Sequence, residues 1–137
     1  MTVTDAHVVL QIVSSEFTVA QLIELAGFEP TSHGEKGARA RPRSVPRPAN
    51  YISFSTEKLS DVRELNVHLS LLSKNVPVDG FSNRFRDKDV QIFLTVYWWT
   101  TEDVKFSLSS DSLAVLAQIG VETEFNLMVN PSPISND

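Results

Sequence analysis

The segment that most constrains the fold is residues 90–100, which alternate with the two-residue period of a β-strand. Aliphatic side chains and Trp98 occupy one set of alternate positions. The other set becomes aromatic toward the end of the segment, with Phe93, Tyr97 and Trp99. Because both sets are apolar there, the strand is either covered on both sides at the centre of a sheet or leaves an aromatic face exposed.

Two helices have clear start and stop signals. Thr18 and Gln21 form a capping box, and Gly27 supplies the left-handed residue that ends a helix. Ser109 is a second N-cap, and Gly120 ends the helix that follows it. In this second helix the side chains expected in the core are Leu113, Leu116 and Ala117.

A longer helix is predicted from about Asp61 to Lys74, with Ser60 as its cap. Apolar residues recur in it at steps of three and four, which is the spacing of a core-facing stripe. The stripe consists of Val62, Leu65, Leu69 and Leu72. Pro77 and the Asp79–Gly80 pair end the helical pattern.

The remaining strand patterns cover residues 7–13, 51–56, 104–108 and 121–129. Together with the helices they give the order β-α-β-α-β-β-α-β. This order predicts an α+β fold: a mixed, largely antiparallel sheet with helices mainly on one face, as a variant of the ferredoxin-like sandwich.

The chain has 137 residues, a common length for a single domain. We expect one domain over residues 1–130, a basic Pro- and Arg-rich loop at 32–50 within it, and a flexible tail at 131–137. The sequence has no cysteine, which excludes a disulfide framework, a thiolate metal site and a cysteine nucleophile. With no signal-peptide pattern and no long apolar run, we expect a cytoplasmic protein without membrane contact.

The charge is distributed unevenly along the chain. The net charge is −5, but residues 32–50 hold five basic side chains against Glu35 alone, so the rest of the chain carries −9. An acidic body repels phosphate, and we therefore do not expect general affinity for nucleic acid. The basic loop is either solvated or contacts an acidic partner or anion through Lys36, Arg39, Arg41, Arg43 and Arg47.

Motifs for catalysis are absent from the sequence. There is no H-E-x-x-H, Walker A, G-x-G-x-x-G or G-x-S-x-G pattern, so we expect no metal, no cofactor and no enzymatic activity. His7, His33 and His68 are isolated from one another in sequence, and we interpret His7 and His68 as structural. Glu122 and Glu124 would share one face of a strand about 7 Å apart, a spacing that also suits glycosidases, but exposure to water is the simpler interpretation.

Binding to another protein is the better hypothesis from these residues. Large aromatic side chains dominate interface hot spots, and the helices can cover only one face of the sheet. The candidate aromatic anchors are therefore those on the second face, and the candidate acidic contacts lie near the strand ends. The partner-binding set is Phe93, Tyr97, Trp99, Asp87, Asp89, Glu122 and Glu124.

The segment Leu25-Ala26-Gly27-Phe28-Glu29-Pro30-Thr31 resembles the L-x-G-[IF]-E-P-T element of the DUF4279 family, small bacterial proteins of unknown function. The closing segment of that family is similar to Phe106-Ser107-Leu108-Ser109 followed by Leu113, Leu116, Ala117, Ile119 and Gly120. The resemblance spans roughly residues 5–130. It implies an α+β domain of bacterial or phage origin, and it brings no catalytic residues.

Small acidic cytoplasmic proteins of this kind are often immunity proteins, which bind and neutralise a toxin domain. Our first hypothesis is therefore a non-catalytic protein-binding module, an immunity-type inhibitor that occludes a toxin or effector domain. The alternative is a module that senses an anionic small ligand through its Arg-rich loop. The oligomeric state is left open.

Overall fold

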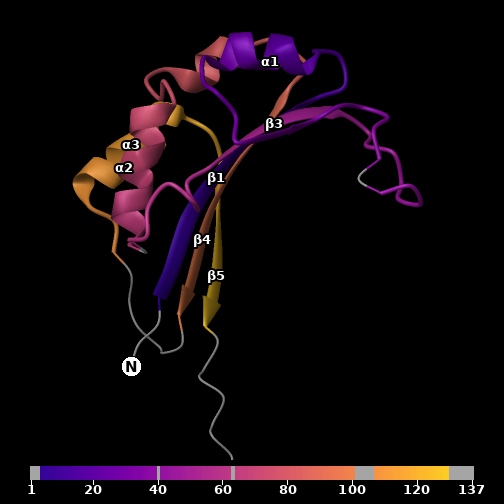
Figure 1. Ribbon diagram of the computed structural model, residues 1–137. Coiled ribbons are helices and arrows are strands. Elements are labelled where there is room, and N and C mark those ends of the chain that lie inside the picture. The colour runs from indigo at the N-terminus through magenta and orange to yellow at the C-terminus, as the bar shows by residue number, and fades with distance from the viewer. Residues whose placement is uncertain (1–3, 40, 63, 101–106, 130–137) are drawn as a thin grey trace, which may run out of the picture.

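The computed structural model describes residues 4–39, 41–62, 64–100 and 107–129, and it has an α+β fold (Figure 1). Its sheet has five strands in the order β2-β3-β1-β4-β5. The strands are β1 (Thr4–Ser14), β2 (Ser32–Gly34), β3 (Asn50–Ser55), β4 (Gln91–Thr100) and β5 (Thr123–Val129). The helices are α1 (Val19–Ala26), α2 (Leu65–Asn75) and α3 (Ser110–Ile119), with a 3-10 turn η1 (Phe81–Phe85).

The long strand β1 lies at the centre of the sheet. It pairs antiparallel with β3 on one side and with β4 on the other, while β4 and β5 are parallel neighbours. The predicted class, a mixed and largely antiparallel sheet, is confirmed. The strand order departs from the ferredoxin-like arrangement, in which another strand separates the two parallel strands of each βαβ unit. Here α3 connects two strands that are adjacent.

The helices cover only one face of the sheet (Figure 1). Alternate residues of the strands enter this single core, where Val8 and Leu10 of β1 and Val96 of β4 are completely buried. Phe81 of η1 and Leu69 of α2 close the core from the helix side. Trp98 is buried on this same face, as the alternation predicts. The opposite face has no helix over it within the described residues.

The predicted caps of the first and last helices are confirmed. Thr18 accepts a hydrogen bond from the Gln21 N–H, the Gln21 side chain accepts one from the Thr18 N–H, and Gly27 follows with φ 76°. Ser109 accepts from the Ser112 N–H, and Gly120 follows α3 with φ 70°. Both terminal glycines adopt the left-handed conformation that other residues resist.

The middle helix is shorter than predicted. It begins at Leu65 after Glu64, which makes no side-chain cap, whereas the Ser60 hydroxyl accepts from the Val62 N–H at 3.0 Å. Val62 is therefore 50% exposed and not part of the buried stripe. The prediction for Leu65, Leu69 and Leu72 is confirmed, since all three are buried.

The predicted core face of the last helix is confirmed for Leu116, which packs partly buried against the core, and is wrong for Leu113 and Ala117, which are exposed. The buried side chains of α3 are Ser112, Val115 and Ile119, while Leu113 is 52% exposed. A polar contact with α2 fixes this rotation: the side-chain oxygen Oδ1 of Asn66 accepts from the Ser112 hydroxyl at 2.6 Å and from the Ser109 N–H at 2.9 Å. Ser112 therefore faces α2, and Leu113 turns outward.

Two predicted segments lie wholly or mostly outside the described residues. The strand expected at 104–108 is described only at Ser107 and Leu108, which are not in a strand. The tail expected at 131–137 lies entirely outside. Within the described residues, none of the helices has the length and apolar character that crossing a membrane requires.

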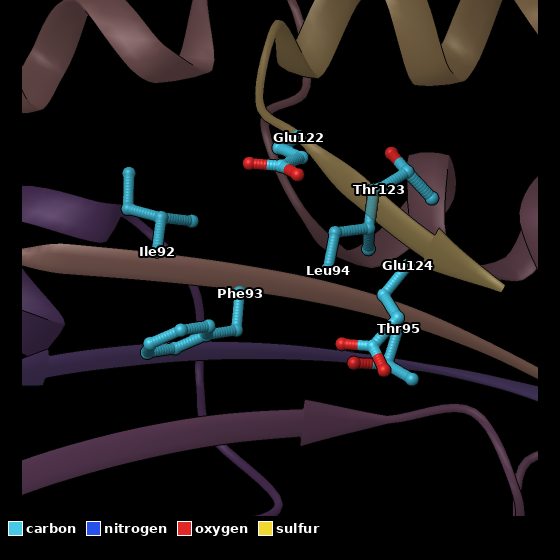
Figure 2. A pocket seen from close by; sticks show the side chains of 7 residues that line it. All are labelled: Ile92, Phe93, Leu94, Thr95, Glu122, Thr123 and Glu124. Atoms are coloured by element: carbon cyan, nitrogen blue, oxygen red, sulfur yellow. The ribbon is translucent and has the colours of Figure 1, made fainter. Parts of the chain in front are cut away.

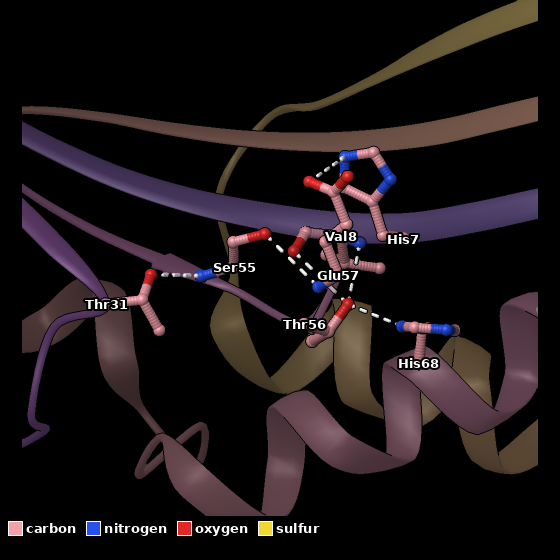
Figure 3. A network of polar contacts seen from close by, with 7 residues as sticks. All are labelled: His7, Val8, Thr31, Ser55, Thr56, Glu57 and His68. Atoms are coloured by element: carbon pink, nitrogen blue, oxygen red, sulfur yellow. Dashed lines mark hydrogen bonds and ion pairs between the residues drawn. The ribbon is translucent and has the colours of Figure 1, made fainter. Parts of the chain in front are cut away.

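Thr56 joins the central strand to α2 inside the core (Figure 3). Its hydroxyl oxygen accepts from the Val8 N–H at 2.9 Å and lies 2.7 Å from Nδ1 of the fully buried His68. The other ring nitrogen, Nε2, lies 2.7 Å from the Val62 carbonyl oxygen. A carbonyl only accepts, so Nε2 carries the proton, and in the neutral ring Nδ1 accepts from the Thr56 hydroxyl. His68 is therefore structural, as expected, and it lies in the core.

Replacing Thr56 by valine should lower the free energy of unfolding by about 1–3 kcal/mol, because it leaves the Val8 N–H and His68 Nδ1 buried without this partner. Chemical denaturation of Thr56→Val beside the wild type measures the loss. Thr56→Ser keeps the hydroxyl and should cost less than Thr56→Val. Equal stability of Thr56→Val and the wild type would contradict the importance of this hydroxyl.

Candidate functional site

The face of the sheet that points away from the helices, called here the bare face, is the largest candidate site. Strand alternation sends to it the residues that the core does not take. From the centre outward these are His7, Val9, Gln11 and Val13 of β1, Phe93, Thr95, Tyr97 and Trp99 of β4, Tyr51, Ser53 and Ser55 of β3, and Glu124, Asn126 and Met128 of β5.

The predicted aromatic anchors do lie together on this face. Phe93 is 47% exposed, and Tyr97 and Trp99 follow it along β4 as half-buried side chains. The Tyr97 ring stacks on the His7 ring with centroids 4.7 Å apart and planes 15° apart. Met128, in register with Trp99, is 53% exposed. The row is thus partly supported by its neighbours and partly open to a partner.

A shallow hollow of about 200 Å³ lies at the Trp99 end of this row. Tyr97, Trp99 and Met128 contribute to its wall, and Asp5, His7 and Asn126 add polar groups. The sequence hypothesis did not include His7 and Met128 in the site. The alternation of β1 already placed His7 opposite the core residues, but pairing with Tyr97 needs the strand register, which the sequence does not contain.

Glu122 and Glu124 border a second, larger hollow of about 480 Å³ beside Phe93 (Figure 2). It forms because β5 begins at Thr123, opposite Leu94, and leaves the first residues of β4 without a neighbouring strand on that side. Glu124 points to the same side of β4 as Phe93 and Thr95. Glu124 and Phe93 are therefore neighbours on the bare face, whereas Glu122 borders the hollow from the other side of β4.

The expectation that Glu122 and Glu124 share one strand face is wrong. Figure 2 shows Glu122 on the side of β4 opposite to Glu124. Glu122 precedes the first residue of β5, so strand alternation does not control its direction. Both side chains are exposed, which supports the interpretation that they face water.

Asp87 and Asp89 are exposed but do not join the glutamates in an acidic patch. They alternate with Arg86 and Lys88, so residues 86–89 carry no net charge. Asp87 occupies a turn with φ 61°, and the Asp89 backbone oxygen accepts from the Ser14 hydroxyl at 2.7 Å. These two residues shape the entry into β4, at the end of the sheet where β1 finishes.

The segment expected as a basic loop contains the short strand β2, and its described residues between 35 and 49 are in neither strand nor helix. Residues 32–34 form β2, which pairs antiparallel with β3, and residues 35–49, called here the arm, continue from this pair. Backbone hydrogen bonds cross the arm from Gly37 to Arg47 at 2.9 Å and from Arg47 to Ala38 at 2.9 Å. At its base the Asn50 side chain accepts from the Lys36 N–H and donates to the Phe17 carbonyl. The arm is thus a defined element of the fold.

Two of the predicted arginines have roles inside the arm. Arg39 donates to the Ser44 carbonyl at 2.8 Å and so braces the turn at residues 41–44. Arg47 lies over the Tyr51 ring, 5.3 Å from its centroid, in a cation–π contact. Lys36, Arg41 and Arg43 are exposed.

Gly34 makes this packing possible. A Cβ atom there would lie 2.4 Å from the Tyr51 ring and 2.8 Å from Arg47 Nε, so both side chains occupy the space that any other residue would fill. Gly34 and Tyr51 are also cross-strand partners. An aromatic ring that covers a glycine of the neighbouring strand stabilises the pair.

A metal-dependent site finds no support in the described part of the chain, where no group of three acidic or histidine side chains is close enough to hold an ion. The bare face offers aromatic and acidic contact groups. Such a surface suits recognition of another macromolecule.

Comparison with known proteins gives one match. A family model described as Domain of unknown function (DUF4279) matches residues 4–130. No curated protein and no solved structure matches the chain.

Gly34→Ala should lower the free energy of unfolding by about 1–3 kcal/mol, because the new methyl group overlaps the Tyr51 ring and Arg47. Denaturation of the wild type, Gly34→Ala, Tyr51→Ala and the double variant forms a double-mutant cycle. In the Tyr51→Ala background the Gly34→Ala change should cost less, because the ring is gone. Equal costs in both backgrounds would contradict the packing described here.

Proposed function

The chain belongs to the DUF4279 family, and we propose that it is a non-catalytic protein-binding module whose docking surface is the bare face of the sheet. The observation that carries this proposal is the exposure of Phe93 and Met128, at 47% and 53%, on the face without helices. Exposed large apolar side chains on a sheet face that no helix covers are typical of protein interaction sites.

The proposed partner presents a basic surface. Outside residues 32–50 the chain carries −9, and Glu122 and Glu124 lie beside the aromatic row. An acidic field attracts a basic partner over long distances and speeds encounter, whereas apolar contacts slow dissociation. Toxin and effector domains that act on nucleic acids have such basic surfaces, because they bind phosphates. We therefore propose an immunity-type inhibitor that acts in the bacterial cytoplasm.

The proposed mechanism is occlusion. Tyr97 and Trp99 are half-buried and held by neighbouring strands, so little side-chain freedom remains to be lost on binding. Phe93 would insert into the partner, while Glu122 and Glu124 would pair with basic groups at the edge of its active surface. A rigid sheet that covers this surface excludes the substrate without any chemical step.

The alternative, a sensor of anionic ligands in the arm, has weaker support. Arg39 and Arg47 are engaged within the arm or against Tyr51, as described above, so only part of the basic set is left to enclose a small molecule. This alternative predicts a higher melting temperature with an anionic ligand. A thermal-shift screen of phosphorylated and carboxylated metabolites tests it directly.

The docking proposal predicts that Trp99→Ala combined with Glu122→Ala and Glu124→Ala weakens partner binding by at least about 2 kcal/mol, roughly 30-fold in Kd. A tagged wild-type chain would first capture the partner from source cells after nuclease treatment. Calorimetry with the purified partner would then compare the wild type, the triple variant and Phe93→Ala, an exposed change that spares the fold.

Leu113→Ala is the matched control, because Leu113 is 52% exposed on the helix side of the molecule. It should bind as the wild type does. Unchanged affinity of the triple variant, or equal losses in the control, would refute docking through the bare face. Capture that disappears with nuclease would indicate nucleic acid in place of a protein partner.

A further inference from the structure

We propose that a second copy of this chain covers the bare face in the free protein, across a two-fold axis parallel to β1, with the arm of each copy against Glu122 and Glu124 of the other. The inference rests on the proposed function only because the same face is used. It adds a form of regulation, because a second copy of the chain covers the docking surface until the partner displaces it.

The strand directions place the basic arm and the two glutamates, Glu122 and Glu124, at one end of the sheet. Both β3 and β4 run antiparallel to β1, and β5 runs parallel to β4, so β3, β4 and β5 all start at the same end. The basic arm directly precedes β3, and Glu122 directly precedes β5. Since β3 and β5 lie on opposite sides of β1, the arm and the glutamates occupy opposite edges of that one end.

This placement matches one symmetry operation. When two copies stack with their bare faces together, a two-fold axis parallel to β1 exchanges the edges of the sheet but keeps its ends. Each basic arm then lies at the end of the other copy's β5 edge, where Glu124 points to the bare face and Glu122 directly precedes the strand. A two-fold axis across the strands would instead place each arm over the far end of the same edge, away from these glutamates.

The arm extends in a direction that allows this contact. Figure 1 shows it projecting from the sheet on the side opposite to α2 and α3. Arg47 also lies over Tyr51, which belongs to the bare face. With a local charge of +4, the arm is the complement of the acidic edge, and a symmetric dimer makes this contact twice.

The middle of the face is compatible with sheet stacking. Around such an axis β1 faces β1, with the aliphatic Val9 and Val13 among its half-buried residues. The β4 strand of one copy faces β3 of the other, so the large Phe93 lies over the small Ser53 at the same level of the sheet. Large side chains opposite small ones allow two sheets to pack about 10 Å apart.

Sedimentation velocity on the purified full chain, without any partner, tests the dimer. The wild type should dimerise with a Kd below about 100 µM, and higher salt should weaken it because the charged contacts are screened. Arg41→Glu with Arg43→Glu, and separately Glu122→Arg with Glu124→Arg, should each raise the Kd at least about tenfold, because like charges then face each other twice.

Mixing the two charge-reversed variants gives the sharpest result. In the mixed dimer each arm again meets the opposite charge, so dimerisation should return to within about threefold of the wild-type Kd. Lys74→Glu and Glu24→Arg each reverse a single charge, in the same two directions, at exposed positions on the helix side and should leave the Kd unchanged.

A wild type that stays monomeric to about 100 µM would overturn the inference. A dimer whose Kd is unchanged by both charge reversals would also overturn it. So would two charge-reversed variants that do not dimerise when they are mixed. These failures are distinct from failure of the proposed function. If the wild type is monomeric but the triple variant at Trp99, Glu122 and Glu124 still loses partner binding, docking through the bare face stands and only the dimer is refuted.

Discussion

The antiparallel pairing of β1 with both of its neighbours is the constraint on which the rest of the structure depends. It aligns the starts of β3, β4 and β5 at one end of the sheet, so chain segments far apart in sequence enter the fold side by side. The arm and the two glutamates owe their positions to this alignment. The buried hydroxyl of Thr56 then ties β1 to α2 and fixes where the helix layer lies.

A one-sided helix layer leaves the second face of the sheet to be explained. Burying apolar area is the main stabilising term in folding, yet Phe93 and Met128 are about half exposed. Their free energy of burial, about 25 cal/mol per Å² of apolar surface, is therefore still available for association. Polar residues such as Gln11 and Asn126 on the same face limit non-specific aggregation. The face thus combines apolar contact area with features of a selective surface.

Local patterns predicted much of the fold, and contacts between distant residues account for the failures. The caps of α1 and α3 and the alternation of β4 depend on neighbours in sequence, and these predictions are confirmed. The rotation of α3 depends on Asn66 reaching Ser112, and the burial of His68 depends on Thr56, so neither could follow from periodicity alone. The aromatic anchors were predictable as residues, but the hollow beside Phe93 required knowing where β5 starts.

The internal contacts of the arm reduce the conformational entropy that binding would otherwise cost. A sequence with several prolines and arginines predicts a long loop, and a mobile loop loses conformational entropy when it binds. Here Tyr51 and Arg47 pack into the space that Gly34 leaves, and backbone hydrogen bonds cross the arm from Ala38 to Arg47. That entropy is lost during folding, before any encounter. Exposed charges on an arm held by these contacts can therefore select one orientation of a docking molecule, and geometry adds to the attraction that net charge supplies.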